Sequence, residues 1–123
     1  MVEPLAGRVA ALTDADSART TPILGAPPAY WLDLDRYDPV KTLRARREPT
    51  LFLQGERDYQ VTPALLEEFL AALGDRPGTT VHRFPGLNHL FIAGTGVPRP
   101  AEYGLPGHVD EKVMDLIAEW VSR

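Results

Sequence analysis

The sequence predicts an α/β fold in which two parallel strands are joined by a crossover helix and followed by a C-terminal helix. The continuous apolar run at 50–53 is typical of a strand buried on both faces of a parallel sheet. Residues 79–84 form a second, less apolar strand, expected nearer an edge. The 24 residues between these strands (55–78) have the length of a helical crossover, which should be right-handed.

The N-terminal part carries weaker signals. Residues 3–18 have a faint helical pattern, and 20–28 read as a proline-rich linker without regular structure. A short helix is expected after Pro28, and Asp38-Pro39 should cap and begin another that ends before Pro49.

The crossover and C-terminal helices are the clearest in the chain. Thr62 is a good N-cap, Pro63 a good first residue, and Gly74 a good terminator. The expected buried stripe of this helix is Leu65, Leu66, Phe69, Leu70 and Leu73. A loop rich in Gly and Pro follows residue 89. The last helix has acids at its start, Asp110 and Glu111, and an expected buried stripe of Val109, Val113, Leu116, Ile117, Trp120 and Val121.

Length and composition limit the classes of protein. At 123 residues, with 44% hydrophobic and 24% charged residues, the chain suits one domain and not two. It has no secretory signal or membrane-length apolar run, so we expect a cytoplasmic protein, unless a segment upstream of a truncated chain carries a signal. The absence of cysteine excludes disulfides and thiolate zinc sites. We expect no cofactor.

The charge pattern argues against a nucleic-acid partner, and without a long apolar run we expect no membrane partner either. The net charge is −4, and the one basic cluster is short and has no interleaved aromatic residues. We interpret this cluster as a solvated helix face; its members are Lys41, Arg44, Arg46 and Arg47.

Two residues with catalytic chemistry follow the two strands. Asp58 comes just after the first strand and His89 just after the second. The carboxyl ends of parallel strands meet at one edge of a sheet, where ligands bind. A carboxylate there could hold the imidazole in the tautomer that accepts a proton. Taken singly, each residue could instead have a purely structural role in stabilising its own turn. A metal site from His82, His89 and His108 is disfavoured, because a mid-strand His82 should point away from the strand-end turn.

The two turns together resemble a known family. G-E-R-D-Y-Q-V after the first strand and G-L-N-H after the second resemble the C-terminal portion of α/β-hydrolase serine hydrolases, over roughly residues 28–123. The resemblance implies that Asp58 is the triad acid and His89 the general base. Glu56 would be the next acid candidate if a complete parent enzyme kept its activity after Asp58→Asn. Tyr59 and Asn88, which flank the pair, are weaker substrate-binding candidates.

The resemblance also implies a division of the chain. Residues 1–37 would be the end of a helical cap or lid region. Residues 38–123 would be the C-terminal part of the hydrolase domain, with the two strands last in its sheet.

The family's nucleophile is missing. No G-x-S-x-G elbow occurs, and Ser17 and Ser122 do not lie on a strand-to-helix turn. Thr62 is better explained as a helix cap, and direct attack by water remains a minor alternative. We therefore expect no two-step acyl chemistry from this chain alone, and whether it is itself an enzyme stays open.

The predicted fold is also incomplete, because two strands leave an apolar strand with an open edge. Truncation of a longer hydrolase is favoured over completion by a partner or an oligomeric domain. The expected function is the C-terminal part of a serine hydrolase that cleaves a small-molecule carboxylic ester or related acyl bond. The alternatives are a serine peptidase acting on a peptide substrate, and a non-catalytic fragment that binds a partner or self-associates through the open sheet edge.

Overall fold

A computed structural model describes residues 3–123 and divides the chain into two compact units. The first unit ends at Thr42 and the second runs from Leu43 to Arg123. The boundary falls inside helix α3 (Pro39–Ala45), a few residues beyond the predicted boundary at 37–38. Each unit is described by itself below. The interpretation of residues 1–37 as the end of a cap region stays a prediction.

The first unit contains helix α1 (Glu3–Ala10), the 3₁₀ helix η1 (Asp14–Asp16) and helix α2 (Pro28–Arg36). Helix α2 is confirmed, and it begins at Pro28, one residue before the predicted start. The linker-like stretch before it has neither helix nor strand, apart from an isolated bridge between Ile23 and Ala26. Ile23 is buried, and its carbonyl accepts a hydrogen bond of 2.8 Å from the Trp31 indole.

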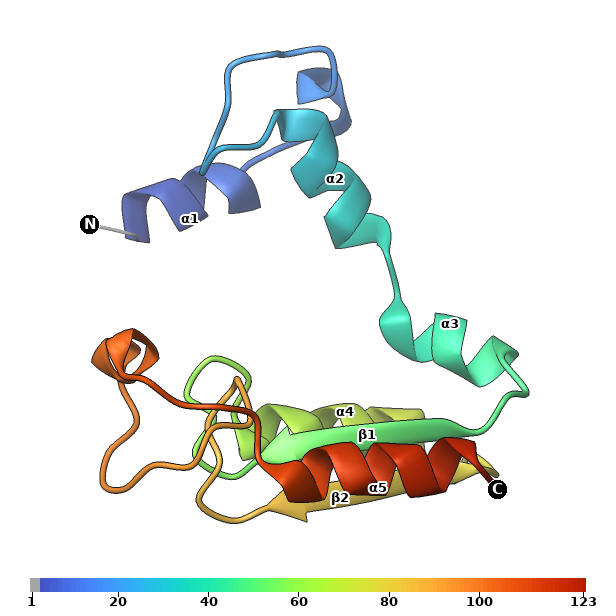
Figure 1. Cartoon of the computed structure of the whole chain (residues 1–123). Helices are drawn as coiled ribbons and strands as arrows, with labels where there is room; N and C mark the ends of the chain where they lie inside the picture. The colour runs from blue at the N-terminus through green and yellow to red at the C-terminus, as the bar shows by residue number, and fades with distance from the viewer. Residues whose placement is uncertain (1–2) are drawn as a thin grey trace. The chain divides into compact units, whose positions relative to one another are not determined.

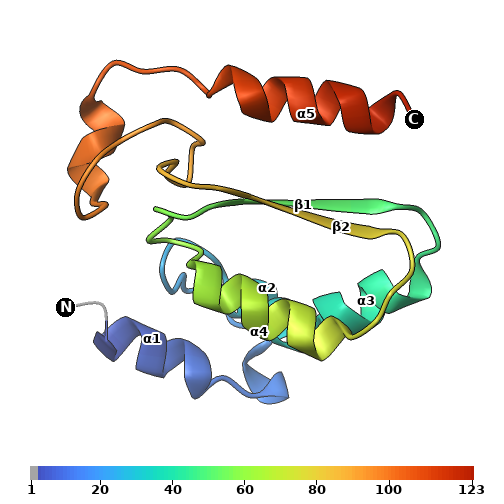
Figure 2. The same cartoon turned by 90° about the horizontal axis from the view of Figure 1, so that it is seen from below.

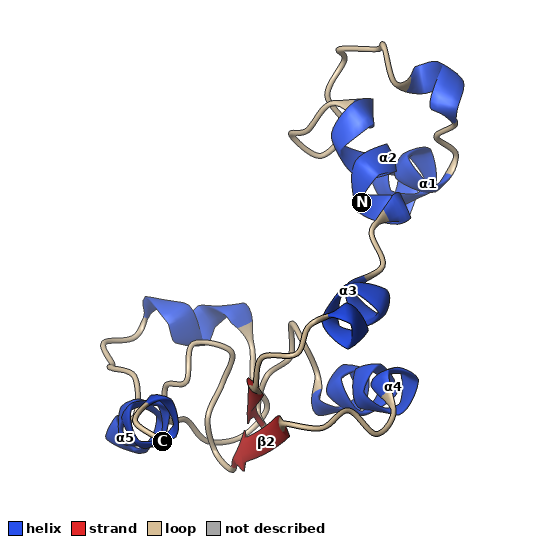
Figure 3. Cartoon of the chain, turned by 90° about the vertical axis from the view of Figure 1, so that its right-hand side faces the viewer, coloured by secondary structure: helices blue, strands red, loops and turns tan. Residues whose placement is uncertain are grey.

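The second unit is built on a two-stranded parallel sheet. Strand β1 (Thr50–Gly55) pairs with β2 (Thr79–Phe84) in a register that runs from Thr50↔Thr79 to Gly55↔Phe84. Helix α4 (Pro63–Leu73) covers one face of the sheet and helix α5 (Glu111–Val121) covers the other (Figures 1 and 2). The end-on view shows the three layers side by side (Figure 3). This partial α/β arrangement confirms the predicted fold class.

The helix caps follow the sequence signals. The Asp38 carboxylate accepts from the Lys41 amide at 2.8 Å, at the start of α3. The Thr62 hydroxyl accepts from the Leu65 amide at the start of α4, and Gly74 ends α4 with a φ of 67°. The Asp110 carboxylate accepts from the Lys112 amide at 2.9 Å at the start of α5. Each cap satisfies a backbone amide that the helix leaves unpaired.

Arg44, one of the exposed residues of the basic cluster, also contacts a neighbouring helix. Its guanidinium donates to the carbonyls of Ala72 and Leu73, at 2.5 and 3.1 Å. These carbonyls lie in the last turn of α4, where a helix leaves acceptors unpaired and favours a positive charge. Arg44 therefore caps α4.

The core of the second unit is small. Phe84, Leu87 and Val113 are buried together, and Leu53, Phe91 and Leu116 pack against them. Leu51 and Phe52 are only half-buried, so the expectation that the strand is buried on both faces is wrong within the described residues. Two strands roughly 5 Å apart offer each helix a narrow surface. The edges of both predicted stripes are accordingly exposed rather than buried: Leu65 on α4, and Val109, Ile117 and Val121 in or beside α5.

The loop after His89 contains a short 3₁₀ helix, η2 (Pro100–Gly104), which was not predicted. Within residues 3–123, no helix is both long enough and apolar enough to cross a membrane.

Gly55 allows the chain to pass directly over the turn that follows β2. A Cβ atom on Gly55 would lie 2.6 Å from the carbonyl oxygens of both Leu87 and Asn88. Real Cβ atoms do not approach backbone atoms this closely, so any other residue would force the two turns apart.

We therefore predict that Gly55→Ala lowers the free energy of unfolding by about 1–3 kcal/mol, the usual cost of overpacking. Gly104→Ala is the matched control, because a Cβ there would meet nothing within 4 Å. Its stability should stay within about 0.5 kcal/mol of the parent. Urea unfolding followed by tryptophan fluorescence measures both variants. Equal stability of the two would contradict the proposed role of Gly55.

Candidate active site

The turn after β1 holds Asp58 in a fixed position. The Asp58 amide donates to the Gly55 carbonyl at 3.1 Å. Its carboxylate Oδ1 accepts from the amides of Gln60 and Val61, at 2.8 and 2.9 Å. Asp58 is only 8% exposed. The side chain therefore holds its own loop as a local Asx-type turn, with its second oxygen, Oδ2, available for another partner.

A buried glutamine at the end of β1 stabilises this turn. The Gln54 amide nitrogen donates to the carbonyls of Gly55 and Val61, at 2.8 and 2.9 Å. These bonds close both ends of the loop that carries Asp58. Because Gln54 is buried, the hydrogen bonds also satisfy polar groups that water does not reach.

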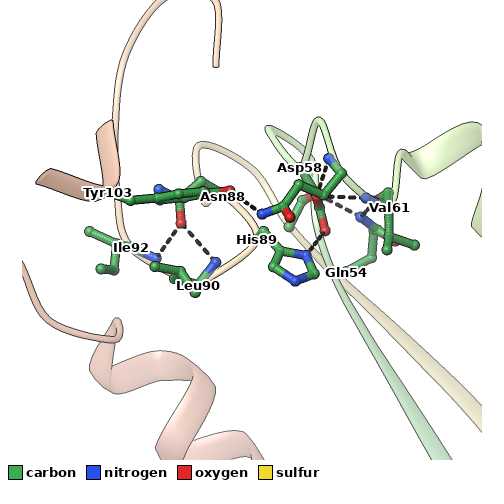
Figure 4. Close-up of polar contacts among 10 residues, drawn as sticks. Gln54, Asp58, Val61, Asn88, His89, Leu90, Ile92 and Tyr103 are labelled. Carbon is green, nitrogen blue, oxygen red and sulfur yellow. Dashed lines mark hydrogen bonds and ion pairs between the residues drawn. The ribbon is translucent and has the colours of Figure 1, made fainter. Parts of the chain in front are cut away.

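The turn after β2 is organised by Asn88, which is 2% exposed. Its side-chain oxygen accepts from the amides of Leu90 and Ile92, at 3.0 and 3.1 Å (Figure 4). Phe91 takes a φ of 56°, in the left-handed region that few side chains adopt, and its amide donates to the Asn88 carbonyl. This tight turn projects His89 toward the first turn.

Asp58 and His89 meet, as the sequence predicts. The His89 Nδ1 lies 2.8 Å from the Asp58 Oδ2, and Figure 4 shows the two side chains pointing toward each other. A carboxylate flanked by two other donors acts as an acceptor, so Nδ1 carries the proton. The other ring nitrogen, Nε2, is then the one that can accept a proton when the imidazole is neutral. The His89 side chain is 38% exposed.

Backbone bonds join the two turns. The Glu56 amide donates to the Phe84 carbonyl at 3.1 Å, and the Arg57 amide donates to the Leu87 carbonyl at 2.9 Å. These bonds extend the parallel pairing beyond the strand ends. The relative position of Asp58 and His89 is thus set by main-chain contacts as well as by their own hydrogen bond.

The segment around η2 packs against the first turn. Arg57 and Glu102 form an ion pair whose side chains are 12% and 17% exposed, with Nη2 2.5 Å from Oε1. The Arg57 guanidinium also donates to the carbonyls of Thr95 and Gly96. Tyr103 stacks on Tyr59, with ring centroids 5.9 Å apart. These contacts fasten the long loop beside the Asp58–His89 pair.

The stacked pair of Tyr59 and Tyr103 also has polar neighbours. The Gln60 side chain donates to the Tyr103 hydroxyl at 2.7 Å. Burial raises the pKa of the Tyr59 phenol, and the neighbouring Tyr103 hydroxyl and the carboxylate charges of Asp58 and Glu102 raise it further. Tyr59 is therefore a neutral phenol at neutral pH, beside the acid turn.

The structure brings some of the remaining sequence candidates to the site and not others. Tyr59 follows Asp58 in the sequence, and its ring stacks on Tyr103. The side-chain oxygen of Asn88 is bonded to two backbone amides of its own turn. Glu56 is exposed and makes no side-chain bond to His89 among the described residues. His82 and His108 are exposed. Within residues 3–123, no three His, Asp or Glu side chains gather as a metal ion requires.

The hydroxyl candidates have other partners. Thr62 caps α4, as predicted. Ser122 lies at the end of α5 and donates to the Ala118 carbonyl at 2.7 Å. That end of α5 lies beside the starts of the two strands (Figure 1), whereas His89 follows the end of β2. Ser17 belongs to the first unit. In the second unit, no serine lies on a strand-to-helix turn.

Sequence analysis missed four supporting residues. Gln54 carries a signal, since it is a polar residue at the end of an apolar strand. Arg57 stands inside the recognised turn, but its partners come from a loop without periodicity. Glu102 and Tyr103 lie in that Gly- and Pro-rich loop and carry no local signal of their own.

The chain is similar to one characterised protein. It is 42% identical over 101 residues to Esterase EstD of Thermotoga maritima, an alignment that covers 82% of this chain. The chain spans only about a quarter (24%) of that relative's length. No family model and no solved structure matches the chain.

The Arg57–Glu102 pair predicts a dependence of stability on pH. The Arg57 guanidinium holds the pKa of Glu102 below its ordinary value of 4.5; burial opposes this shift, while Asn88 and Arg99 support it. Because the pKa is lower in the folded state, the stabilising contribution is present above pH 4.5 and lost as pH falls through the folded value.

Wild type should therefore be more stable than Glu102→Gln at neutral pH, and the gap should narrow as pH falls below 4.5 through the lowered pKa of Glu102. Urea midpoints at several pH values measure this. Glu67→Gln, which removes an exposed ion pair with Arg83, is the control and should cost less at neutral pH. A gap that stays constant with pH would contradict the assignment.

Proposed function

We propose that this chain is the C-terminal part of a serine α/β-hydrolase that cleaves a carboxylic ester or related acyl bond. Asp58 orients His89, and His89 is the general base. The nucleophilic serine is supplied from outside these 123 residues. The observation that carries the proposal is the hydrogen bond of 2.8 Å between His89 Nδ1 and Asp58 Oδ2 at the carboxyl ends of two parallel strands.

In the proposed reaction, His89 transfers one proton in each of two half-reactions, first from the serine to the alcohol and then from water to the serine. Its Nε2 takes the proton from the serine hydroxyl as the serine oxygen attacks the carbonyl carbon of the ester. It then gives this proton to the departing alkoxide, which leaves as an alcohol and breaks the ester bond. Water repeats the sequence on the acyl-serine and releases the carboxylic acid. Asp58 keeps the proton on Nδ1 and stabilises the imidazolium that forms.

Three observations support these roles. Two backbone amides occupy one carboxylate oxygen of Asp58, and the other oxygen is bonded to His89. His89 is partly exposed, so a substrate can reach its ring. The similarity to Esterase EstD favours an ester as the substrate over a peptide bond. Tyr59, which lies between the acid turn and Tyr103, is the side chain we propose to line the substrate side of the site.

We predict that the 123-residue chain alone does not turn over p-nitrophenyl acetate. Without an activated nucleophile, it should give no burst and no saturable rate, only the slow reaction of an exposed imidazole. The control is His89→Ala at equal concentration, which removes that imidazole. A saturable rate that depends on His89 would show that the chain holds its own nucleophile.

A chimera tests the roles of the pair directly. The matching 101-residue segment of Esterase EstD is replaced by the corresponding segment of this chain. The chimera should hydrolyse p-nitrophenyl esters, and Asp58→Asn should lower kcat by about 10⁴ with little loss of stability, as in the template triad. His89→Ala should lower kcat at least as far.

Glu56→Gln in the same chimera is the matched control for the acid and should leave kcat within about twofold of the parent, as expected for a surface residue that touches no reacting group. Near-full activity of Asp58→Asn would refute the acid assignment. A folded chimera without any activity would refute the proposed function. Activity on a matched p-nitroanilide peptide above that on the ester would favour a peptidase.

A further inference from the structure

The Arg57 side chain reaches from the acid turn to the long loop that follows His89. Arg57 immediately precedes Asp58, and its side chain is 12% exposed. Its guanidinium donates to the Thr95 carbonyl at 3.0 Å and to the Gly96 carbonyl at 3.2 and 3.3 Å. It also donates to both carboxylate oxygens of Glu102, at 2.5 and 3.2 Å. One largely buried cation therefore joins the acid turn to two separate parts of the loop.

Residues 86–94 form a small hairpin that carries His89. An antiparallel bridge between Leu87 and Ala93 closes it, together with a hydrogen bond of 3.0 Å from the amide of its last residue to the carbonyl of its first. The backbone amide of Arg57 donates to the Leu87 carbonyl, in the first arm, at 2.9 Å. The two carbonyls that its guanidinium contacts directly follow the second arm. Arg57 therefore holds the hairpin by both arms.

Gly94, at the end of the second arm, leaves room for the guanidinium. A Cβ atom there would collide with Nη1 of Arg57 and would lie 3.0 Å from its Cζ. The backbone of Gly94 does not take a positive φ, so its conformation alone does not require a glycine. The guanidinium thus occupies the space that a side chain at residue 94 would need.

We propose that Arg57 is a positioning residue for the Asp58–His89 pair. It is bonded to the acid through the chain and to both arms of the imidazole hairpin through hydrogen bonds. Among the described residues, its side chain makes no hydrogen bond to either member of the pair. The proposal rests on the proposed function for its catalytic meaning, whereas the contacts belong to this chain by itself.

A guanidinium is suited to this task by chemistry. Its donors point in fixed directions, so one planar group can hold two carbonyls and a carboxylate in a defined arrangement. Glu102 balances the charge, and the pair is mostly shielded from water, so salt screens it less than an exposed pair. A lysine would keep the charge but would supply a point donor in place of the planar fork.

The test measures the tautomer of His89 in the 123-residue chain. Nitrogen NMR of isotope-labelled histidine, at an alkaline pH where the imidazole is neutral, gives the ratio of the Nδ1–H form to the Nε2–H form. The His89→Ala variant identifies the signals. In the parent, the Nδ1–H form should predominate, because Nδ1 donates to the Asp58 carboxylate.

Two variants disturb the guanidinium from opposite sides. Arg57→Lys keeps a positive charge beside Glu102 but loses the fork, and it should lower the tautomer ratio about tenfold, as expected for loss of hydrogen bonds to a charged group. Gly94→Ala keeps Arg57 and pushes its guanidinium aside, so it should lower the ratio in the same direction. This second variant keeps the proposal testable if the first does not fold.

Two matched controls separate positioning from a general loss of stability. The Arg76 guanidinium donates to three carbonyls that precede β1, at 2.7 to 3.0 Å, and so forms a similar clamp at the starts of the strands. Arg76→Lys should lower the urea midpoint without changing the tautomer ratio. Gly104→Ala is the control for Gly94→Ala, and it should change neither quantity, because a Cβ there meets nothing within 4 Å.

An unchanged ratio in folded Arg57→Lys or folded Gly94→Ala would overturn the proposal. An equal fall in Arg76→Lys would also overturn it, since general loosening would then explain the effect.

The chimera with Esterase EstD separates this proposal from the proposed function. In the chimera, Arg57→Lys should lower kcat about tenfold and leave KM within about twofold, because the side chain touches no reacting group. A folded but inactive chimera, together with the altered tautomer ratio, would refute the ester function and keep the positioning role. An active chimera with an unchanged ratio would keep the ester function and overturn the positioning role.

Discussion

The close approach of the two strand-end turns at Gly55 is the constraint on which the site depends. Two parallel strands end at the same edge of their sheet, but pairing alone leaves their loops free to diverge. Here the backbone of Gly55 lies against the carbonyls of Leu87 and Asn88, and amides of the first turn continue the ladder to the second. Side chains from the two turns are then close enough to contact each other. A carboxylate and an imidazole do so at hydrogen-bond distance.

The buried polar residues of the second unit all serve this approach. They are Gln54, Asp58 and Asn88, and each one accepts from or donates to the backbone of a turn. Burial makes every such bond costly to lose, because water cannot replace the missing partner. The same bonds would stabilise any βαβ unit with these loops. What makes the arrangement chemically specific is that one oxygen of Asp58 is left over for a histidine.

The strands, the crossover helix and the Asp58–His89 pair could be predicted because their signals are local. The apolar patterns, the helix caps and the positions of Asp58 and His89 after the strands each lie within a few residues of the structure that they predict. Burial could not be predicted as well: the apolar stripe of α5 is wider than two strands can cover, so Ile117 and Val121 are exposed. Glu102 was missed for a different reason. Its role depends on a contact across 45 residues to Arg57, in a loop with no periodicity.

Under the proposed function, the acid and the base are separable from the rest of the active site. Everything that fixes their geometry, from Gln54 to Tyr103, lies in one βαβ unit and the loop that returns over it. In the proposed hydrolase, a nucleophile and a site for the developing oxyanion would meet the exposed face of His89. An Asp–His pair held in place this way raises no rate alone, because catalysis depends on groups that act together in the transition state. Under the proposed function, the position of the proton acceptor thus depends on this unit alone, while the source of the proton is a separate property of the complete site.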